Sequence, residues 1–353
     1  RMSRGLGDVY KRQTFNFMLF NSRIIGLGHY LPQNVVTNND LSKLMDTSDD
    51  WITERTGIKE RRFIKKKSFE GTASMACNAS KIAISNAGIK NSDIELVIFS
   101  TLSPDYFFPG SGVILQDMMN LGTCPALDIR NQCSGFIYGI SVADQFIKTG
   151  MYKNILLVGS ENQSGGLDLT TRGRATSVIF GDGAGAVVLN RENDLKKGIM
   201  STHLYSQGKF AKELSVIGPS TKKWIHEVFR GYNENDPKYH PYMNGKLVFK
   251  NAVMRFTEVI NETFKKNNLS KKDIDLFIPH QANLRISQFI QKKFNFNDNQ
   301  VFNNIMRYGN TTAASIPIAL SEAMSEGRIK RNDNILLAAF GSGFTWGRAF
   351  IKW

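Results

Sequence analysis

The residue best suited to covalent chemistry is Cys133, which lies in the stretch Asn131-Gln-Cys-Ser-Gly-Phe136. The apolar run 126–129 before it predicts a short strand, and apolar residues at steps of three and four from Phe136 predict a helix that ends at Gly150. The thiol is therefore expected at a helix N-terminus, where unpaired N–H groups and the helix dipole favour a thiolate. Free cysteines are also often small buried hydrophobic residues, so this stretch alone leaves both interpretations open.

The chain contains an internal repeat that predicts where partners for this thiol lie. Two segments recur 180 residues further along: 93–98 recurs as 273–278, and 154–158 recurs as 334–338. Two matches with one spacing predict two copies of a unit in which strands and helices alternate. We place the first half at about 18–192 and the second at about 193–353.

The second half carries a histidine and an asparagine at equivalent positions of the repeat. His280 follows a strand pattern and corresponds to Ser100 of the first half. Asn310 lies in the strand-to-helix turn that corresponds to the Cys133 turn. Ligands bind at the carboxyl ends of strands in open α/β sheets. A pseudo-twofold relation between the halves therefore predicts that Cys133, His280 and Asn310 converge.

Such a set of residues supports acyl transfer. The imidazole stabilises or generates a thiolate, the thiolate attacks a thioester carbonyl, and backbone N–H groups hold the oxyanion. The N–H of Cys133 and the glycine-rich stretch Phe340-Gly-Ser-Gly-Phe344 can supply those groups. A cysteine protease uses similar residues, so the three side chains do not identify the reaction by themselves.

The composition limits the other classes of function. The formal charge is +14, but the Lys and Arg residues are scattered and no zinc-finger, RNA-recognition or basic-zipper signature is present. An acidic protein partner or a phosphate-rich ligand therefore fits better than nucleic acid. The apolar runs are far shorter than the ~20 residues of a membrane span. The three cysteines form no disulfide framework and no metal pair, which indicates a reducing, cytoplasmic compartment and no metal site.

Two segments have no role in this chemistry. Residues 1–17 show no periodicity and resemble translated vector sequence, so we interpret Met18 as the natural start. The run Gly181-Asp-Gly-Ala-Gly185 lacks the lysine and the following helix of a phosphate-binding loop. We interpret its glycines as permitting close backbone approach rather than as a nucleotide site.

From Met18 onward the chain resembles β-ketoacyl-acyl-carrier-protein synthase III, a family of the thiolase superfamily. The matching segments are 48–58 (SDDWITERTGI), 131–136 (NQCSGF), 180–186 (FGDGAGA), 280–286 (HQANLRI), 309–317 (GNTTAASIP) and 340–347 (FGSGFTWG). Their order and spacing together are specific. The resemblance implies an α/β, thiolase-like fold in which two duplicated halves form a five-layered αβαβα arrangement.

The resemblance also implies a reaction. Cys133 takes an acyl group, typically acetyl, from an acyl-CoA substrate. Malonyl-acyl carrier protein then loses CO₂, and its enolate attacks the acyl-enzyme to give a 3-oxoacyl-acyl carrier protein, which starts a fatty acid chain. His280 and Asn310 donate hydrogen bonds to the malonyl thioester oxygen, and the N–H groups of Cys133 and Ser342 form the oxyanion hole. The family implies a homodimeric acyltransferase without a cofactor.

The other site residues follow from the resemblance alone. Coenzyme A binding is implied for Trp51, Arg55, Arg174 and Lys246, with the adenine between Trp51 and Arg174. The acyl pocket is implied for Phe180 and for Phe108, which would reach into the other subunit of the dimer. Acidic carrier protein would bind Lys250, Arg285, Lys292 and Lys293. Trp51 could instead belong to the core, and the lysines could be ordinary solvated charges.

The chain departs from the family pattern in two places. Ser342 stands where glycine or alanine is common, which matters little because only its N–H is used. Residues 211–244 look longer than in the housekeeping enzyme, and they carry Trp224, His226, Phe229, Tyr232, Tyr239, His240 and Tyr242. The acyl preference is therefore open. The alternatives are a condensing enzyme of secondary metabolism with a different or longer acyl group, and an acyl-thioester hydrolase or transferase on the same fold.

Overall fold

The computed structural model describes residues 20–68, 70–220, 233 and 235–353. Our interpretation of residues 1–17 lies outside this part of the chain. The same is true of Trp224, His226, Phe229 and Tyr232 in the aromatic segment. Within the described residues, no helix has the length and apolar character to cross a membrane.

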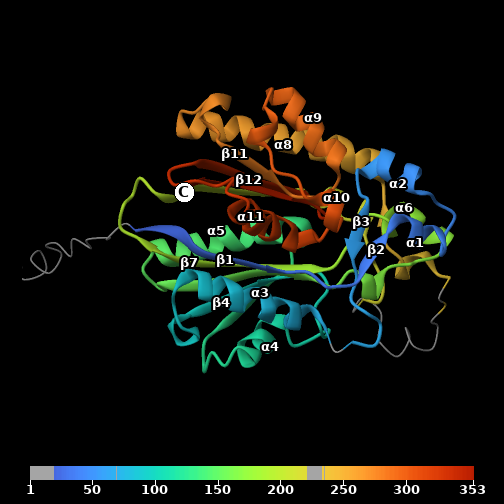
Figure 1. The fold of residues 1–353 in the computed structure, drawn as a ribbon, viewed down its shortest axis with the longest axis horizontal. Helices are drawn as coiled ribbons and strands as arrows, with labels where there is room; N and C mark the ends of the chain where they lie inside the picture. Colours follow the sequence, from blue (N-terminus) through green and yellow to red (C-terminus); the bar gives the residue numbers. More distant parts are fainter. Residues whose placement is uncertain (1–19, 69, 221–232, 234) are drawn as a thin grey trace, which may run out of the picture.

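Two sheets with the same internal order form the framework (Figure 1). The first has the order β1-β7-β6-β4-β5, and the second has the order β8-β13-β12-β11 when read in the same direction. In both sheets the first two pairings are antiparallel and the next is parallel. The first sheet contains β1 (Asn21–Tyr30), β7 (Gly183–Glu192), β6 (Asn154–Glu161), β4 (Leu96–Ser100) and β5 (Ala126–Ile129). The second contains β8 (Gly198–Ser206), β13 (Thr345–Lys352), β12 (Asn334–Gly341) and β11 (Leu276–Pro279).

The place of β5 in the second half is taken by a single parallel bridge between Phe277 and Val301. Three equivalent pairs begin 180 residues apart: the strands β4 and β11, the strands β6 and β12, and the central helices that begin at Gly135 and Ser315. The short turns before the two central helices, 132–134 and 312–314, also follow this spacing. The duplication inferred from the sequence is therefore present in the topology.

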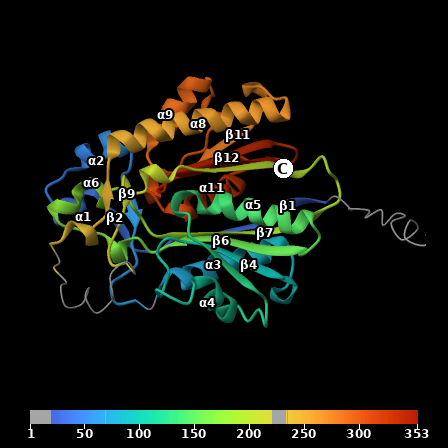
Figure 2. The same ribbon diagram turned by 180° about the vertical axis from the view of Figure 1, so that it is seen from behind.

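Helices separate and cover the two sheets in five layers (Figures 1 and 2). The central layer contains α5 (Gly135–Lys148) and α11 (Ser315–Ser325), whose buried residues belong to one hydrophobic cluster with strands of both sheets. The outer layers are α3 (Thr72–Ala87) with α4 (Ser111–Met118) on the first sheet, and α8 (Gly245–Asn267) with α9 (Leu284–Phe294) on the second. This arrangement confirms the predicted αβαβα fold.

The central strands read as continuous apolar runs because both of their faces are covered. Ile155, Leu156, Leu157 and Val158 of β6 all have no exposed surface. Burial of one such side chain contributes roughly 1.5–3 kcal/mol relative to leaving it in water. The same pattern in β12 places both strands in the interior. The carboxyl end of each strand contacts the other half: Glu161 accepts a hydrogen bond from the N–H of Ala313, and Gly341 lies against Cys133.

Local sequence signals determine where several helices and strands begin and end. The helix 72–87 ends at Gly88, whose φ of +66° is a left-handed conformation that glycine adopts without strain. Ser48 caps α2 (Asp49–Thr56) by accepting a hydrogen bond from the N–H of Trp51. The repeated segment 93–98 includes the end of a capped 3₁₀ turn at residues 91–93, and the strand β4 begins at Leu96.

Smaller elements collect at the end of the sheets where the parallel strands finish (Figure 1). They are β2 (Val35–Thr37), α1 (Asn38–Ser42), α2, β3 (Glu60–Arg62), α6 (Arg174–Ser177) and α10 (Ile305–Tyr308). A two-stranded ribbon, β9 (Leu214–Ser215) with β10 (Tyr242–Met243), joins the two ends of the aromatic segment. These elements surround the site described next.

Candidate active site

Cys133 lies in the short turn directly before α5, at the position predicted from the sequence. Its side chain is buried, and the end of β12 from the other half packs directly against it. A Cβ atom placed on Gly341 would lie 2.6 Å from the Cβ of Cys133 and 3.1 Å from its Sγ. Only glycine therefore allows the strand of the second half to approach the thiol this closely.

Of the two interpretations that the sequence left open for Cys133, the structure favours a buried neutral thiol over a resting thiolate. Burial, followed by the negative charge of Glu161, raises the pKa of the Cys133 thiol to about 12. The N–H groups of Cys133 and Ser342 do face the sulfur and act in the opposite direction, but they are outweighed. The sequence argument considered the helix end alone, whereas tertiary packing removes the water that would stabilise the anion. The thiol is consequently neutral near pH 7.

His280 lies at the end of β11, and Ser315 at the start of α11 fixes its ring. The distance from Nδ1 of His280 to Oγ of Ser315 is 2.6 Å. Burial lowers the pKa of His280 to about 3, so the ring is neutral near pH 7. Nδ1 is the available acceptor for the Ser315 hydroxyl proton, so we assign the remaining ring proton to Nε2. Nε2 is buried and, among the described residues, has no hydrogen-bond partner.

Asn310 is held by hydrogen bonds at both its backbone and its side chain. Its N–H donates to the carbonyl of Ile179 at 2.8 Å, and its carbonyl accepts from the N–H of Gly181 at 3.1 Å. Its side-chain oxygen accepts from the N–H of Thr312 at 2.8 Å. Because that bond occupies the amide oxygen, the Nδ2 group is the part of the side chain that can donate to a ligand.

The structure brings Cys133, His280 and Asn310 together in one cavity of about 140 Å³. The other lining residues are mostly apolar: Ile179, Phe180, Leu214, Met243, Gly245, Val248, Phe249, Ala252, Phe256, Ala282, Asn283, Ile286, Phe340 and Gly341. A thiol with two neutral donors in an apolar cavity suits a carbonyl or thioester group, because an oxyanion that forms there has no competing water. The convergence that the repeat predicted is thus present.

Three polar residues that support this site were missed in the sequence. Ser315 lies inside the segment 309–317, but only the structure shows that it contacts His280. Gln281 accepts from the N–H groups of Asn304 and Ile305 at 3.0 and 3.2 Å, which ties the His280 strand end to the start of α10. The order of residues along the chain gives no signal for such contacts.

The third missed residue is Glu161, a fully buried carboxylate at the end of β6. It accepts from Oγ1 of Thr101 at 3.0 Å, from Oγ of Ser103 at 2.7 Å and, across the two halves, from the N–H of Ala313 at 3.3 Å. Burial raises its pKa to about 7 despite these donors. Ala313 lies in the turn that positions Asn310, so Glu161 links this turn to the first half.

Three of the four residues expected to bind coenzyme A lie on α2 and α6: Trp51, Arg55 and Arg174. Trp51 belongs to the same hydrophobic cluster as the lining residues Ile179 and Phe180. The guanidinium carbons of Arg55 and Arg174 lie 4.6 and 4.9 Å from the Trp51 ring centroid. An adenine ring stacked between Trp51 and Arg174 needs a contact of ~3.5–4 Å on each face, so the indole and the guanidinium would have to lie about 7 Å apart. The expected slot between Trp51 and Arg174 is therefore closed in this conformation, and a ring can enter only if Arg174 moves.

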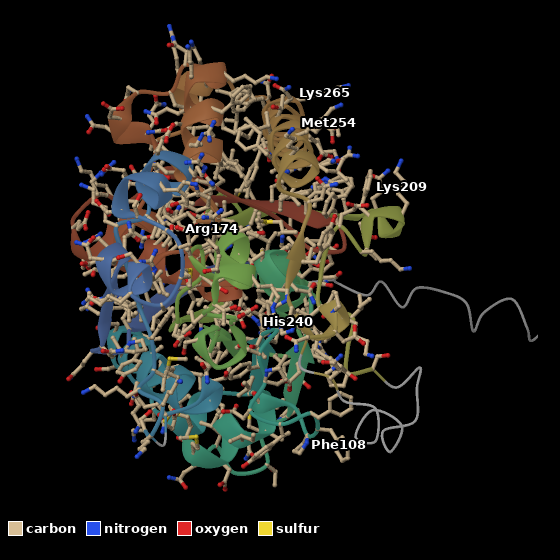
Figure 3. The ribbon with its side chains drawn as sticks, turned by 90° about the vertical axis from the view of Figure 1, so that its right-hand side faces the viewer. Phe108, Arg174, Lys209, His240, Met254 and Lys265 are labelled. Carbon is tan, nitrogen blue, oxygen red and sulfur yellow. The ribbon has the colours of Figure 1, made fainter. Side chains whose placement is uncertain are left out.

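The remaining predicted residues lie in different surroundings. Phe180 lines the cavity, and exposed Lys246 follows the lining residue Gly245 on α8. Phe108 does not line this cavity: it is 80% exposed and projects from the molecule (Figure 3). Figure 3 also shows Arg174 on the face that carries α2 and α6.

The four residues expected to bind carrier protein are all exposed on the outer layer of the second half. Lys250 lies on α8, and Arg285, Lys292 and Lys293 lie on α9. The two helices pack against each other and contribute Phe249, Ala252 and Ile286 to the cavity wall. The predicted basic patch is thus next to the cavity rather than remote from it.

The aromatic segment 211–244 also reaches the cavity through its described ends. Leu214 and Met243 form a pair in the β9–β10 ribbon, and both line the cavity. Ser342 donates a side-chain hydrogen bond to the carbonyl of Leu214, which fixes the ribbon to the stretch whose N–H faces Cys133. Among the residues that the structure describes, Cys77, Cys124 and Cys133 are free, and no cluster of His, Cys, Asp or Glu could hold a metal ion.

Comparison with known proteins agrees with this geometry. The family described as 3-oxoacyl-[acyl-carrier-protein (ACP)] synthase III matches residues 127–208, and its C-terminal family matches 264–353. The β-ketoacyl-[acyl-carrier-protein] synthase III of Aliivibrio fischeri is 46% identical over 331 residues, which cover 94% of this chain and 99% of that protein.

Solved structures give the same result. The 3-oxoacyl-[acyl-carrier-protein] synthase III of Aquifex aeolicus superposes with a TM-score of 0.85 at 42% identity, covering 94% of this chain and 100% of that one. The priming β-ketosynthase of the R1128 polyketide pathway superposes with a TM-score of 0.84 at 27% identity, covering 94% and 96%. The chain therefore belongs to the β-ketoacyl-[acyl-carrier-protein] synthase III family.

Proposed function

We propose that this protein condenses an acyl-CoA with malonyl-acyl carrier protein, with loss of CO₂, to give a 3-oxoacyl-acyl carrier protein that starts a fatty acid chain. One observation carries the proposal: the Cys133 thiol shares an apolar cavity with two neutral donors, His280 and Asn310. The first step needs a nucleophile, and the second needs donors for an enolate oxygen. The cavity contains both.

In the first step the sulfur of Cys133 bonds to the acyl carbonyl carbon, and the bond from that carbon to the sulfur of coenzyme A breaks. The proton lost by the Cys133 thiol is balanced by the proton gained by the departing coenzyme A thiol. The N–H groups of Cys133 and Ser342, which face the sulfur, stabilise the oxyanion of the tetrahedral intermediate. The raised pKa of the thiol means that the resting protein holds this proton, which is then lost during acyl transfer.

In the second step Nε2–H of His280 and Nδ2–H of Asn310 donate to the thioester oxygen of the malonyl group. The bond to the carboxylate breaks, CO₂ leaves, and the electron pair passes into an enolate. The enolate carbon attacks the acyl carbonyl, the bond to the Cys133 sulfur breaks, and the thiolate regains a proton. The His280 and Asn310 side chains stabilise this oxyanion as neutral donors in an apolar cavity. The lowered pKa of His280 keeps its imidazole a weak base.

The two substrates reach this cavity from its outer rim. For coenzyme A we propose Trp51, Arg55, Arg174 and Lys246, with displacement of Arg174 from the Trp51 ring when adenine enters. For acidic carrier protein we propose Lys250, Arg285, Lys292 and Lys293 on α8 and α9, whose charges attract an anionic surface.

The proposal also covers the assembly. The 80% exposed Phe108 ring suits insertion into the acyl pocket of a second subunit of a homodimer. We propose that the boundary between the two halves along the sequence lies between residues 192 and 193, in the connection from β7 to β8. The three free thiols fit a reducing cytoplasm, and no cofactor beyond the substrates is needed for the reaction.

Acetyl is the simplest acyl group for an enzyme that starts a fatty acid chain. The β9–β10 ribbon, however, suggests a second candidate function. Leu214 and Met243 line the cavity at the two ends of the aromatic segment, where they can alter the accepted chain. The R1128 enzyme shows that a related fold carries a priming ketosynthase of polyketide biosynthesis. The second candidate is therefore a condensing enzyme that takes a different or longer acyl group.

One experiment separates these functions. The protein and its Cys133→Ala variant are incubated with acyl-CoAs of graded length and with malonyl-acyl carrier protein. Release of CO₂ with a 3-oxoacyl product supports condensation, and the chain-length profile identifies the acyl group. Loading of Cys133 followed only by hydrolysis would contradict the proposal.

A further inference from the structure

A second cavity, of about 310 Å³, lies at the opposite end of the sheets from Cys133. It is formed by the beginnings of β1 and β8, the end of β13 and the turn that follows α11. The chain ends beside it, far from α2 and α6 in Figure 1. Four cationic residues line it: Arg23, Lys197, Arg331 and Lys352. Among the described residues, no aspartate or glutamate side chain lines it.

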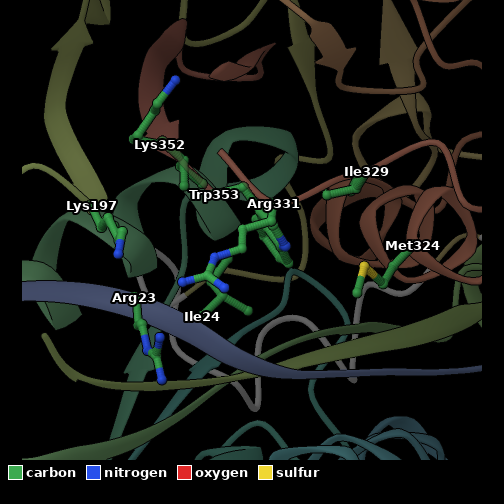
Figure 4. Close-up of a pocket in the computed structure, with 10 residues that line it drawn as sticks. Arg23, Ile24, Lys197, Met324, Ile329, Arg331, Lys352 and Trp353 are labelled. Atoms are coloured by element: carbon green, nitrogen blue, oxygen red, sulfur yellow. The ribbon is translucent and has the colours of Figure 1, made fainter. Parts of the chain in front are cut away.

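The side chains approach one another from both halves of the molecule. Figure 4 shows Arg331 at the centre, with Arg23 and Lys197 on one side of it and Ile329 and Met324 on the other. Like charges around one cavity repel each other, and an anion that binds between them would relieve this repulsion.

The backbone fixes three of these cations around Gly198. Gly198 pairs with Lys352 across the β8–β13 ladder and directly follows Lys197. A Cβ atom on Gly198 would lie 2.2 Å from the carbonyl oxygen of Ser22 and 3.3 Å from the Cβ of Arg23. The φ of Gly198 is also +85°, so only glycine permits this close approach. The backbones of Arg23 and Lys352 therefore lie in paired strands, and Lys197 directly precedes one.

The fourth cation, Arg331, lies on a turn that is tied to the last strand. The N–H of Asn332 donates to the carbonyl of Trp353, and the N–H of Trp353 donates to the carbonyl of Asp333, each at 2.8 Å. On the other side of the cavity, the Asn21 side chain donates to the carbonyl of Lys197 at 2.8 Å. A site whose charged groups are held in advance loses little entropy when a ligand binds.

Neighbouring carboxylates neutralise part of the positive charge. Arg23 pairs with Glu192 at 3.3 Å, and Lys197 pairs with Asp194 at 3.2 Å. In the part of the chain that the structure describes, the Arg331 and Lys352 side chains have no ion pair and no hydrogen bond. Together with the terminal carboxylate of Trp353, which also lines the cavity, they leave a net positive charge that favours an anionic ligand such as a phosphate monoester.

The cavity is larger than a phosphate group and has an apolar wall. Ile24, Ile329 and Ile351 line it and are buried, and Trp353 is partly buried against the same core cluster. We propose that this cavity binds an organic phosphate of nucleotide size, with the phosphate on Arg331 and Lys352 and the apolar part on the isoleucines. The site is separate from the cavity that contains Cys133, so it adds a binding function to the proposed condensing activity and does not depend on it.

Isothermal titration calorimetry with AMP as the probe tests this site on the full chain, with inorganic phosphate titrated in parallel. We expect AMP to bind at a site that the Trp51→Ala variant retains, and to bind there more tightly than inorganic phosphate. The double variant Arg331→Gln with Lys352→Gln should weaken AMP binding by about tenfold or more, because it removes both unpaired cations. The control Lys330→Gln removes an exposed charge from the same turn without touching the cavity, so its AMP affinity should be unchanged.

Three results would overturn the proposal. They are no binding of AMP up to about 1 mM, equal affinity in the double variant and the unaltered protein, and AMP binding no tighter than that of inorganic phosphate. A Trp51→Ala variant separates this site from the proposed coenzyme A site. Unchanged AMP binding in that variant supports the second cavity, whereas its loss would assign AMP to the adenine site and refute the inference. Thermal melting of each variant checks that it is folded.

Discussion

The hydrogen bond between Ser315 and His280 offers the sharpest prediction about the site. Ser315→Ala removes the hydroxyl that donates to Nδ1 of His280 at 2.6 Å. Without this donor, the neutral imidazole can place its proton on either ring nitrogen and can rotate in its pocket. Only the form with the proton on Nε2 can donate to a thioester oxygen. The variant should therefore lose enolate stabilisation without losing its nucleophile.

The size of the effect follows from the bond that is lost. A buried acceptor that is left without its donor costs about 1–3 kcal/mol. A loss of 1.36 kcal/mol in transition-state stabilisation is tenfold in rate, so decarboxylation should slow by roughly 10- to 100-fold. Acyl transfer to Cys133 uses the N–H groups of Cys133 and Ser342 instead. Its rate should fall by no more than about threefold, since those groups are unaltered.

Two single-turnover assays measure these steps separately. Intact-protein mass spectrometry follows acyl loading of Cys133 from acyl-CoA, and release of labelled CO₂ from malonyl-acyl carrier protein follows decarboxylation. The matched control is Ser321→Ala, because Ser321 lies on the same helix and bonds Nδ1 of a different histidine, His29, at 2.8 Å. Its decarboxylation rate should be unchanged. Equal slowing of loading and decarboxylation by Ser315→Ala, or equal effects of the two variants, would refute the assigned tautomer.

Three further predictions concern the same site. Gly341→Ala should abolish acyl loading, measured by mass spectrometry, because its Cβ would lie 2.6 Å from the Cβ of Cys133; normal loading would contradict the packing. Trp51→Ala should raise the KM for acyl-CoA by about tenfold, since stacking contributes about 1 kcal/mol or more, with kcat little changed in steady-state assays; a fall in kcat alone would argue against adenine binding. Burial lowers the pKa of His280 from 6.5 to about 3, so below pH 6.5 the unfolded chain takes up a proton that the folded chain does not. The stability advantage of wild type over His280→Asn in urea unfolding should thus shrink by about 2 kcal/mol between pH 7 and 5; the raised pKa of Glu161 acts in the opposite sense in both proteins and cancels in this difference.

The duplicated fold could be predicted because the signal is repeated along the chain. Fully covered strands such as β6 and β12 must be apolar throughout, so their sequences remain similar in both halves. The spacing also predicted that the turn of Cys133 and the turn before α11 are equivalent. Convergence of Cys133, His280 and Asn310 followed from that symmetry rather than from any single motif.

The remaining features depend on contacts between distant segments, which composition and periodicity do not report. The helix end at Cys133 suggested a thiolate, yet burial determines the pKa of the thiol. The contact of Ser315 with His280 and the link from Glu161 to Ala313 each join different elements. The closed space between Trp51 and Arg174 reflects the position of the Arg174 side chain, which also contacts Asp46.

The central claim is that His280 and Asn310 serve the second half-reaction while Cys133 serves both. The most direct test measures acyl loading and CO₂ release in His280→Ala, Asn310→Ala and Cys133→Ala under identical conditions. Our account predicts that the first two variants still load an acyl group but release no CO₂ from malonyl-acyl carrier protein, and that Cys133→Ala does not load. Equal loss of both half-reactions in His280→Ala and Asn310→Ala would contradict it.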